Sequence, residues 1–477
     1  MLKTVGAYLR YTSWPIVAAM LALMTIGICA LHVSIDTAGG SGRSVTYQTA
    51  YAAVALVAFF VASVIPYQKI GRASYAIFGI CIALLIAVLF TTPIKGSARW
   101  FDLGPIKVQP SEMAKLAYIL MLAWYLRRGS RYRQLRGLIV PFAVSFLPMG
   151  LILIEPDLGT SLLFLPTLYF MLFMAGAKLR HLLLILALGA AVILLPVPRE
   201  VGEDALELQE KAYAASSFGP LTIYGVSDDA DAPEGLDLPI AYVRVGVGDS
   251  VYDIQPLSIR LMRGHQMDRI KGWLRQDDEK VAIKEGFQLR WSLITLAAGG
   301  WRGPSDEVDA SGASAQDMYT LALQQLPHEK TDFIFSVIAG RWGLLGCLVL
   351  LALYGVIFVF GLEISTVTDD PFGRLLAVGI VGLLLSQVMI NIGMTMGLMP
   401  ITGMTLPMVS YGGSSLVASC TALGLLVNVA RRRAIYLSRR PFDYSRRRQR
   451  QANIDSAKEL SSRNNGSENG TRNADYH

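Results

Sequence analysis

The sequence predicts an all-α integral membrane protein that crosses the bilayer about ten times and carries one large loop between its seventh and eighth spans. Two observations support this fold class. Of the 477 residues, 53% are hydrophobic and 17% are charged, whereas soluble domains carry about 25% charged residues. The apolar residues also form blocks of about 14 to 28 residues, around the length of about 20 residues that crosses the hydrocarbon core. The composition therefore excludes an ordinary soluble protein.

Ten apolar blocks are predicted to be membrane-spanning helices. In chain order they are Trp14–Leu31, Thr49–Ile65, Ser74–Phe90, Met113–Leu126, Leu138–Ile154, Leu158–Ala175, Leu182–Val197, Phe333–Phe360, Leu375–Met396 and Leu416–Val429. Lys3 and Arg10 precede the first block, but no small-residue cleavage site follows it, so we interpret it as an uncleaved anchor. The four cysteines lie inside the blocks, and their spacing fits no metal site or disulfide framework.

Basic residues between the blocks predict the orientation of the chain. They are concentrated after the second, fourth and sixth spans and at the start of the tail, as Lys69, Arg72, Arg127, Arg128, Arg131, Arg133, Arg136, Lys178, Arg180 and Arg431 to Arg433. All of these fall on one side of the bilayer, which the positive-inside rule assigns to the cytoplasm. With ten spans, both termini are then cytoplasmic, and the expected location is the cytoplasmic (inner) membrane of a bacterium.

The spans divide the chain into four regions. Spans one to seven occupy residues 1–197, a large extracytoplasmic loop occupies 198–332, spans eight to ten occupy 333–430, and a basic disordered cytoplasmic tail occupies 431–477. The tail holds nine arginines between Arg431 and Arg450. It produces much of the net charge of +7, which we attribute to attraction to anionic membrane lipid rather than to nucleic acid.

The large loop begins with an acidic segment, about residues 199–263, that we interpret as an insert. Loops this long are usually functional or folded in their own right. Apolar and polar residues alternate over Ala241–Val247, which predicts a β-strand. A small folded module and a partly disordered insert remain the two alternatives.

The segment Gly96–Lys115 carries charges that resist the predicted topology. Arg99 and Lys107 lie in a basic loop on the outer side, which is suited to binding phosphate groups. Chance scatter of charges is the alternative. Glu112 and Lys115 follow at the start of the fourth span, three residues apart, so both can face one cavity or pair with each other.

Two further segments place carboxylates at the outer ends of spans. In Glu155-Pro-Asp-Leu-Gly-Thr160, proline and glycine explain a tight turn, while Asp157 either caps the next helix or has a functional role. In the second segment, Asp332 ends the large loop where the eighth span begins. A carboxylate at this low-dielectric boundary suits a general base, because burial raises its pKa. Capping of the eighth span by Asp332 is the alternative.

Helix-breaking residues interrupt the segment from Asn391 to Ser415. Pro400, Gly403, Pro407, Gly412 and Gly413 predict irregular backbone at membrane depth. Such backbone is tolerated only inside protein or beside a wet cavity. We therefore expect this segment to line a cavity for the polar part of a substrate.

Four motifs in these segments resemble the SEDS family (shape, elongation, division and sporulation), which includes RodA, FtsW and SpoVE. They read GSARWFDLGPIKVQPSEMAK, EPDLGTS, TDFIF and GLMPITGMTLPMVSYGGSSL. The resemblance extends to about Arg433. It departs from the family where Lys330 replaces an expected histidine before TDF.

The resemblance implies a ten-span peptidoglycan glycosyltransferase that polymerises lipid II and pairs with a class B penicillin-binding protein, a transpeptidase. It assigns catalysis to Asp332. It also implies substrate contacts to lipid II and the undecaprenyl-pyrophosphate-linked glycan from Arg99, Trp100, Lys107, Glu112, Lys115, Asp157, Ser410, Tyr411, Gly412 and Gly413. No cofactor or metal site is expected, although a divalent cation on the pyrophosphate is left open. The alternatives are a lipid II flippase and a non-catalytic scaffold for a transpeptidase.

Overall fold

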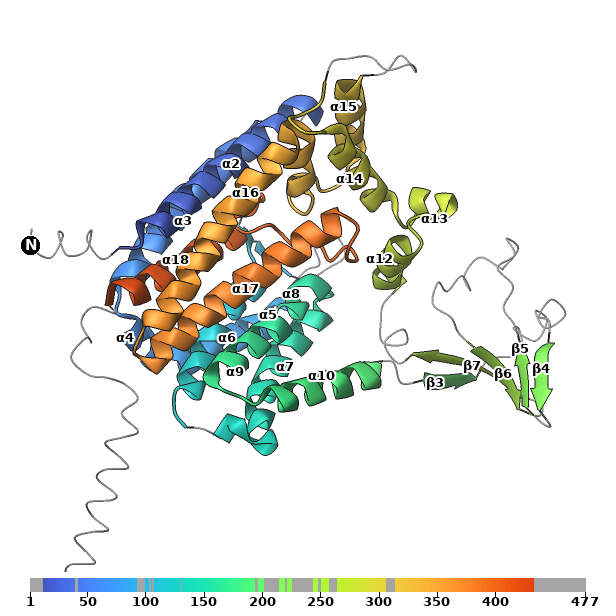
Figure 1. Cartoon of the computed structure of the whole chain (residues 1–477), viewed down its shortest axis with the longest axis horizontal. Helices are drawn as coiled ribbons and strands as arrows, with labels where there is room; N and C mark the ends of the chain where they lie inside the picture. The colour runs from blue at the N-terminus through green and yellow to red at the C-terminus, as the bar shows by residue number, and fades with distance from the viewer. Residues whose placement is uncertain are drawn as a thin grey trace, which may run out of the picture.

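A computed structural model of the chain describes residues 12–38, 42–91, 99–102, 104, 107–129, 131–193, 196–200, 214–218, 221–224, 243–247, 250–256, 264–305 and 314–432. Each predicted span is a helix or a helix pair (Figure 1). In order they are α2 (Trp14–Ala38), α3 (Arg43–Val64), α5 (Ser74–Val88), α6 (Pro110–Leu126), α7 (Ile139–Ile154), α8 with α9 (Leu158–Leu162 and Phe164–Ala175), α10 (Leu179–Ile193), α16 (Ile334–Val367), α17 (Pro371–Thr395) and α18 (Gly413–Arg432).

Seven of the helical spans in the described residues are long and apolar enough to cross a membrane. Helices α5 and α10 are apolar but shorter, and α6 carries the charged residues Glu112 and Lys115 in its first turns. Together these helices account for all ten predicted spans, and the predicted fold class is confirmed. The protein is a multi-pass membrane protein.

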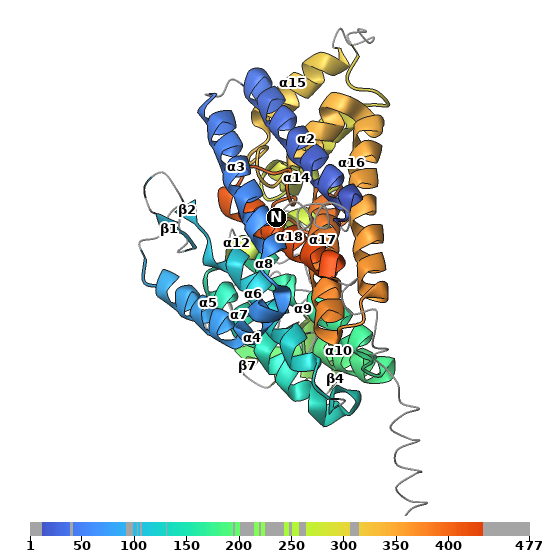
Figure 2. The same cartoon turned by 90° about the vertical axis from the view of Figure 1, so that its left-hand side faces the viewer.

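Helices α17 and α18 form the interior of the bundle. In each of them 78% of the most apolar stretch is buried, against 28% in α3 and in α16. Helix α17 packs against α6, α9, α16 and α18, and α18 packs along α3, as Figure 2 also shows. The apolar side chains of α3 and α16 that remain exposed are therefore available to lipid.

Irregular backbone joins α17 to α18, as predicted. Within residues 397–412, Gly397, Gly403 and Met408 have positive φ angles, and the side chains of Leu406 and Val409 are each 1% exposed. Most residues from Ile401 to Ser410 are buried, whereas Leu398 is exposed. The later part of the segment is thus surrounded by protein, which is the condition under which non-helical backbone is tolerated at membrane depth.

Helix α16 is interrupted at Gly343, whose φ of 64° and ψ of −161° are not helical. A turn after α14 (Phe287–Ala298) fills the break: Leu344 N–H donates to the Gly300 carbonyl at 3.0 Å and Leu345 N–H to the Trp301 carbonyl at 3.2 Å. A Cβ atom at position 343 would lie 2.6 Å from the backbone of this turn. Glycine is required here, because both the φ angle and the close approach exclude a side chain.

The large loop contains an antiparallel sheet of five strands that departs from the all-helical pattern. They are β3 (Pro196–Glu200), β4 (Ala214–Phe218), β5 (Leu221–Tyr224), β6 (Val243–Val247) and β7 (Ser250–Pro256), in the spatial order β3-β7-β6-β5-β4. The predicted strand over Ala241–Val247 is confirmed as β6. Figure 1 places the sheet beyond the end of α10, to one side of the helical bundle.

The loop returns to the bundle through four helices, α12 (Gly264–Leu274), α13 (Glu279–Ile283), α14 and α15 (Ala315–Gln325). Helix α14 packs on α15, α16 and α17, and α15 packs on α2. A short two-stranded ribbon, β1 (Phe101–Asp102) and β2 (Lys107–Val108), precedes α6. The predicted tail lies outside the described residues beyond Arg432, as does most of the acidic segment.

We expect the membrane bundle to fold without strands β4, β5 and β6. Strands β3 and β7 are antiparallel neighbours, with Pro196 opposite Pro256 and Glu200 opposite Tyr252, so the chain leaves and returns at one place. An Asn-Gly turn replacing residues 201–251 would close this pair as a two-residue hairpin. The thermal midpoint of this variant in detergent should match that of the wild type. A variant lacking only the β4–β5 hairpin is the control. If both variants aggregate, the sheet is required for folding of the membrane bundle.

Candidate active site

Asp332 lies in the turn before α16 and is partly buried. The residue at the N-cap position of α16 is Phe333, and no side chain caps this helix. Asn391 of α17 donates a hydrogen bond to the Asp332 carbonyl at 2.9 Å, and the Asp332 N–H donates to the His328 carbonyl at 3.1 Å. These two hydrogen bonds hold the Asp332 backbone in place. The Asp332 carboxylate does not cap α16.

Three kinds of interaction set the acidity of Asp332. Burial removes the carboxylate from water and raises its pKa. The charges of His328 and Arg269 and a hydrogen bond from Thr331 lower that pKa, and the nearby carboxylate of Asp157 raises it. Burial is the largest of these effects, so the group is a stronger base than an exposed aspartate.

Arg269 of α12 is a basic neighbour that the structure adds to this site. A Cβ atom at Gly403 would lie 3.4 Å from Arg269 Nη1 and 3.6 Å from Asp332 Oδ2. Both side chains therefore converge on the same point of the irregular segment. Arg269 Nη1 also donates to the Ile401 carbonyl at 3.4 Å, and burial lowers the pKa of its guanidinium.

The turn between α7 and α8 lies within electrostatic reach of this site. Asp157 caps α8, accepting hydrogen bonds from Thr160 N–H at 3.1 Å and Thr160 Oγ1 at 3.0 Å. Gln109 Nε2 donates to Asp157 Oδ2 at 3.2 Å. The capping role is therefore real, and the carboxylate also contributes charge to the Asp332 site.

Arg99 holds the turn between α7 and α8 by donating hydrogen bonds to the backbone carbonyls of Glu155, at 2.8 Å, and Pro156. Two of its five N–H donors are used in this way, and the guanidinium charge acts on Glu155 and Arg269. Trp100 follows it and is half-buried. Arg99, Asp157 and Asp332, predicted from separate motifs, are thus brought together around Arg269.

Glu155 is buried in an unusual way. Its side chain is 1% exposed, and neither carboxylate oxygen has a hydrogen-bond partner among the described residues. Burial and the charge of Asp157 raise the pKa of Glu155 to about 8, against a smaller lowering by Arg99. A carboxyl group in this position is neutral below that pH.

Glu155→Gln is expected to stabilise the protein in alkaline buffer. Between about pH 4.5 and 8 the folded wild type holds a proton that the unfolded chain has released, so its free energy of unfolding falls as pH rises through this range. Glutamine has no proton to lose. The variant should melt higher than the wild type at pH 8.5 and equally at pH 4.5 in detergent. Glu279→Gln, at an exposed glutamate of α13, is the control. If the thermal midpoint changes with pH equally steeply in both variants, the expectation is contradicted.

Glu112 and Lys115 form a buried ion pair on α6, with 2.9 Å between Lys115 Nζ and Glu112 Oε1. The two residues are 6% and 3% exposed. Lys115 Nζ also lies 3.5 Å from Gln387 Oε1, and Gln387 Nε2 donates to the Thr405 carbonyl at 2.9 Å. The pair therefore connects α6 and α17 to the irregular segment, which favours the paired alternative over direct exposure to a cavity.

The residues Ser410 to Gly412 hold the turn before α16. Ser410 Oγ donates to the Thr331 carbonyl, and Tyr411 N–H donates to the Lys330 carbonyl at 2.9 Å. On their other side, Gly412 N–H donates to Gln48 of α3 at 3.3 Å. These residues position the Asp332 turn through its backbone.

Two other predicted contacts lie at the edge of the site. Gly413 packs against the Tyr51 ring, which a Cβ atom would approach to 2.9 Å. Lys107 is 51% exposed, and its Nζ lies 3.8 Å from Asp102 Oδ2. Its carbonyl accepts from Ser414 Oγ at 2.9 Å, which fastens the β1–β2 ribbon to α18.

Sequence reasoning missed Arg269, Gln109 and Glu155 as site residues. The resemblance to the family resumes after the insert at Arg269–Trp273, but only the proximity of Arg269 to Asp332 indicates its role. Proline and glycine already explain the 155–157 turn, so the presence of two carboxylates in it is a usable signal for Glu155. Within the described ranges, no group of three or more His, Cys, Asp or Glu side chains could hold a metal ion.

Comparison with known proteins identifies the family to which the chain belongs. A model of the cell cycle protein family FtsW, RodA and SpoVE matches residues 11–202 and 239–435. The chain belongs to this family. The resemblance to the SEDS proteins is therefore confirmed. Residues 203–238, which the FtsW/RodA/SpoVE model leaves unmatched, fall inside the predicted insert and contain strands β4 and β5.

Named members of the family are similar over most of the chain. The peptidoglycan glycosyltransferase RodA of Treponema pallidum is 32% identical over 430 residues, which are 86% of this chain and 95% of the relative. The peptidoglycan glycosyltransferase MrdB of Escherichia coli K12 is 32% identical over 360 residues, 75% of this chain and 78% of the relative. Stage V sporulation protein E of Bacillus subtilis is 29% identical over 391 residues, 80% and 86% of the two chains.

Solved structures share the fold. A chain from a structure concerning the coordination of polymerization and crosslinking by a peptidoglycan synthase complex matches with a TM-score of 0.64 at 25% identity, covering 88% of this chain and 98% of that one. The rod shape determining protein RodA of Thermus thermophilus matches with a TM-score of 0.55 at 24% identity, covering 88% and 97%. The FtsW/RodA/SpoVE fold thus extends over nearly all of both chains.

Proposed function

We propose that this protein is a peptidoglycan glycosyltransferase that polymerises lipid II, with Asp332 as the general base. The observation that carries the assignment is the Asp332 carboxylate. It lies in the turn before α16, beside the Arg269 guanidinium, and does not cap the helix that follows it. The names of the T. pallidum and E. coli relatives support the same activity.

The proposed reaction joins two lipid-linked saccharides. The Asp332 carboxylate accepts the proton of an acceptor hydroxyl as its oxygen bonds to the anomeric carbon of the donor glycan. The bond from that carbon to the pyrophosphate breaks, and undecaprenyl pyrophosphate leaves with the bonding electrons. Proton removal by a positioned base contributes roughly 10²–10⁴-fold to such a step.

Positive charge is available for the leaving pyrophosphate. The guanidinium groups of Arg269 and Arg99 lie in the same electrostatic cluster as Asp332 and Asp157. Fixed cations stabilise charge that develops in the transition state. Lys107 is half-exposed at the ribbon and can meet phosphate at the entrance. The proposed transfer uses no cofactor, and a divalent cation carried by the pyrophosphate would supplement these charges.

Polymerisation by the purified protein tests the proposal against its rivals. We expect glycan strands to form from lipid II in detergent without any other protein. A flippase would move lipid II across liposomes without forming strands, and a scaffold would do neither. If the folded, purified protein forms no glycan strands from lipid II, the glycosyltransferase assignment is overturned.

The proposal includes a transpeptidase partner of the class B penicillin-binding protein type and a location in the bacterial cytoplasmic membrane. The structural match to a chain of a peptidoglycan synthase complex supports the partner.

The charge pattern supports the orientation, because Arg127 lies within electrostatic reach of Arg72 and Arg128. Arg432 Nη2 also donates to the Val64 carbonyl at 2.9 Å. These basic residues gather at one end of the bundle, which the positive-inside rule makes cytoplasmic.

Labelling of single cysteines checks the orientation. After replacement of the four native cysteines, Ser217→Cys in β4 should react with an impermeant maleimide in spheroplasts, because the sheet is extracytoplasmic in the proposed topology. Ser445→Cys in the tail should react only after lysis. Labelling of the tail in intact spheroplasts would reverse the topology.

A further inference from the structure

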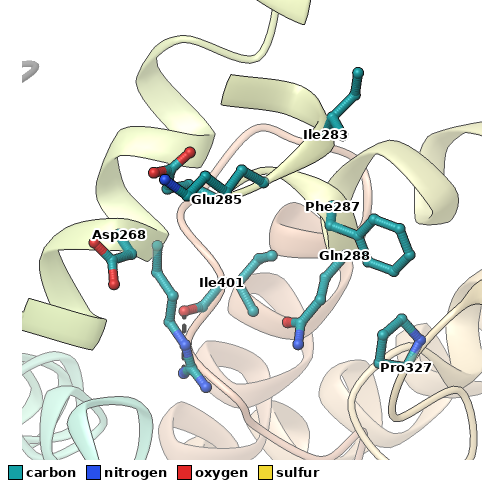
Figure 3. Close-up of a pocket in the computed structure, with 9 residues that line it drawn as sticks. Asp268, Ile283, Glu285, Phe287, Gln288, Pro327 and Ile401 are labelled. Carbon is teal, nitrogen blue, oxygen red and sulfur yellow. Dashed lines mark hydrogen bonds between the residues drawn. The ribbon is translucent and has the colours of Figure 1, made fainter. Parts of the chain in front are cut away.

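A cavity of about 620 Å³ opens beside the Asp332 site. It lies between α12, the start of α14, the Pro327 turn and the irregular segment at Ile401 (Figure 3). Its volume is within the range of about 300–1,000 Å³ that is typical of small-molecule sites.

The cavity and the proposed base share one wall. Arg269 lines the cavity and donates to the Ile401 carbonyl, which also belongs to the lining. The same guanidinium lies against Gly403 together with Asp332 Oδ2. A ligand in the cavity that extends past Arg269 therefore reaches the Asp332 carboxylate.

The lining has an apolar side and a polar side. Figure 3 shows Phe287 and Pro327 on one side, Asp268 and Glu285 on the other, with Gln288 between them. An aromatic ring offers a flat surface to the C–H face of a sugar ring. Carboxylates accept hydrogen bonds from hydroxyl groups, while an amide both donates and accepts.

These polar groups have capacity left for a ligand. Among the described residues, the side chains of Asp268, Lys284, Glu285 and Gln288 make no hydrogen bond or ion pair. The two carboxylates balance the charges of Arg269 and Lys284, so the lining has no net charge. A pyrophosphate would require excess positive charge, whereas a neutral saccharide rich in hydroxyl and amide groups suits this lining.

We propose that the cavity is the acceptor subsite, which binds the N-acetylated amino sugar whose hydroxyl attacks the donor. This inference rests on the proposed glycosyltransferase function. The sugar ring stacks on Phe287, and Gln288 bonds the N-acetyl or hydroxyl groups. The attacking hydroxyl lies past Arg269, where it transfers its proton to Asp332 as its oxygen bonds to the anomeric carbon of the donor. The bond from that carbon to the pyrophosphate breaks, and undecaprenyl pyrophosphate leaves with the bonding electrons.

Binding and kinetics of cavity variants test this assignment in the full-length protein. The probe is the soluble disaccharide of N-acetylglucosamine and N-acetylmuramic acid, titrated into protein carrying Asp332→Asn so that no reaction occurs. Adding Phe287→Leu or Gln288→Leu should weaken binding about tenfold, the effect of about one lost hydrogen bond or contact. Phe287→Tyr, which keeps the ring, should bind as the parent does. Trp301→Leu, at an exposed aromatic residue away from the cavity, is the control.

The same substitutions in the active protein give a second readout. Phe287→Leu and Gln288→Leu should raise the KM for lipid II about tenfold and leave kcat within about twofold. If both variants melt like the wild type and keep its disaccharide affinity and KM, the cavity is not the acceptor subsite, and polymerisation still stands. If the wild type forms no glycan yet binds the disaccharide through Phe287, the glycosyltransferase proposal fails while the sugar site stands. Should Phe287→Leu fail to fold, Gln288→Leu decides alone.

Discussion

Asp332→Asn is expected to reduce lipid II polymerisation by roughly 10²–10⁴-fold, the usual contribution of a general base. The change keeps the shape of the side chain and removes its ability to accept a proton. Folding should be preserved, because Asp332 does not cap α16 and its backbone contacts to Asn391 and His328 do not involve the carboxylate. Purified variant and wild type are compared for glycan formation and for thermal midpoint.

Asp278→Asn provides a matched control for that change. Asp278 caps α13 by accepting from Lys280 N–H at 3.0 Å, and asparagine caps a helix about as well as aspartate. This variant should polymerise lipid II at nearly the wild-type rate. A near wild-type rate for Asp332→Asn as well would remove the catalytic assignment and favour the flippase or scaffold function.

Breaking the buried ion pair of α6 is expected to have the largest effect on stability. Lys115→Met leaves Glu112 as an uncompensated buried charge, which costs about 3–5 kcal/mol of unfolding free energy. The double variant Glu112→Gln with Lys115→Met leaves no charge behind and should recover most of that loss. Thermal and denaturant unfolding in detergent measure the difference.

The ribbon supplies the exposed counterpart of that pair. Lys107 and Asp102 are half-exposed at 3.8 Å, so Lys107→Met should cost about 1 kcal/mol or less. Equal costs for Lys107→Met and Lys115→Met would mean that the α6 pair is not buried in solution. If the double variant refolds to full stability but makes no glycan, Glu112 and Lys115 also have a role in substrate binding.

The membrane architecture could be predicted from the order of the amino acids alone. Each span could be predicted because a bilayer requires about 20 apolar residues with internally satisfied backbone, and this condition is local in the chain. Pro400, Gly403 and Pro407 predicted the irregular segment for the same local reason. The alternation over Ala241–Val247 predicted one strand, but not the pairing of β3 with β7 that closes the sheet, because strand order depends on contacts between distant segments.

The composition of the site, in contrast, depends on contacts that form only in the folded protein. Whether Asp332 caps α16 depends on where that helix begins, and Phe333 occupies the N-cap position. Arg269 reaches Asp332 because α12 folds back over the irregular segment at Gly403. The absence of hydrogen-bond partners for the Glu155 carboxylate among the described residues likewise follows from how the 155–157 turn packs. Burial and charge proximity arise from residues far apart in the sequence, so local composition cannot specify them, whereas the packed chain does.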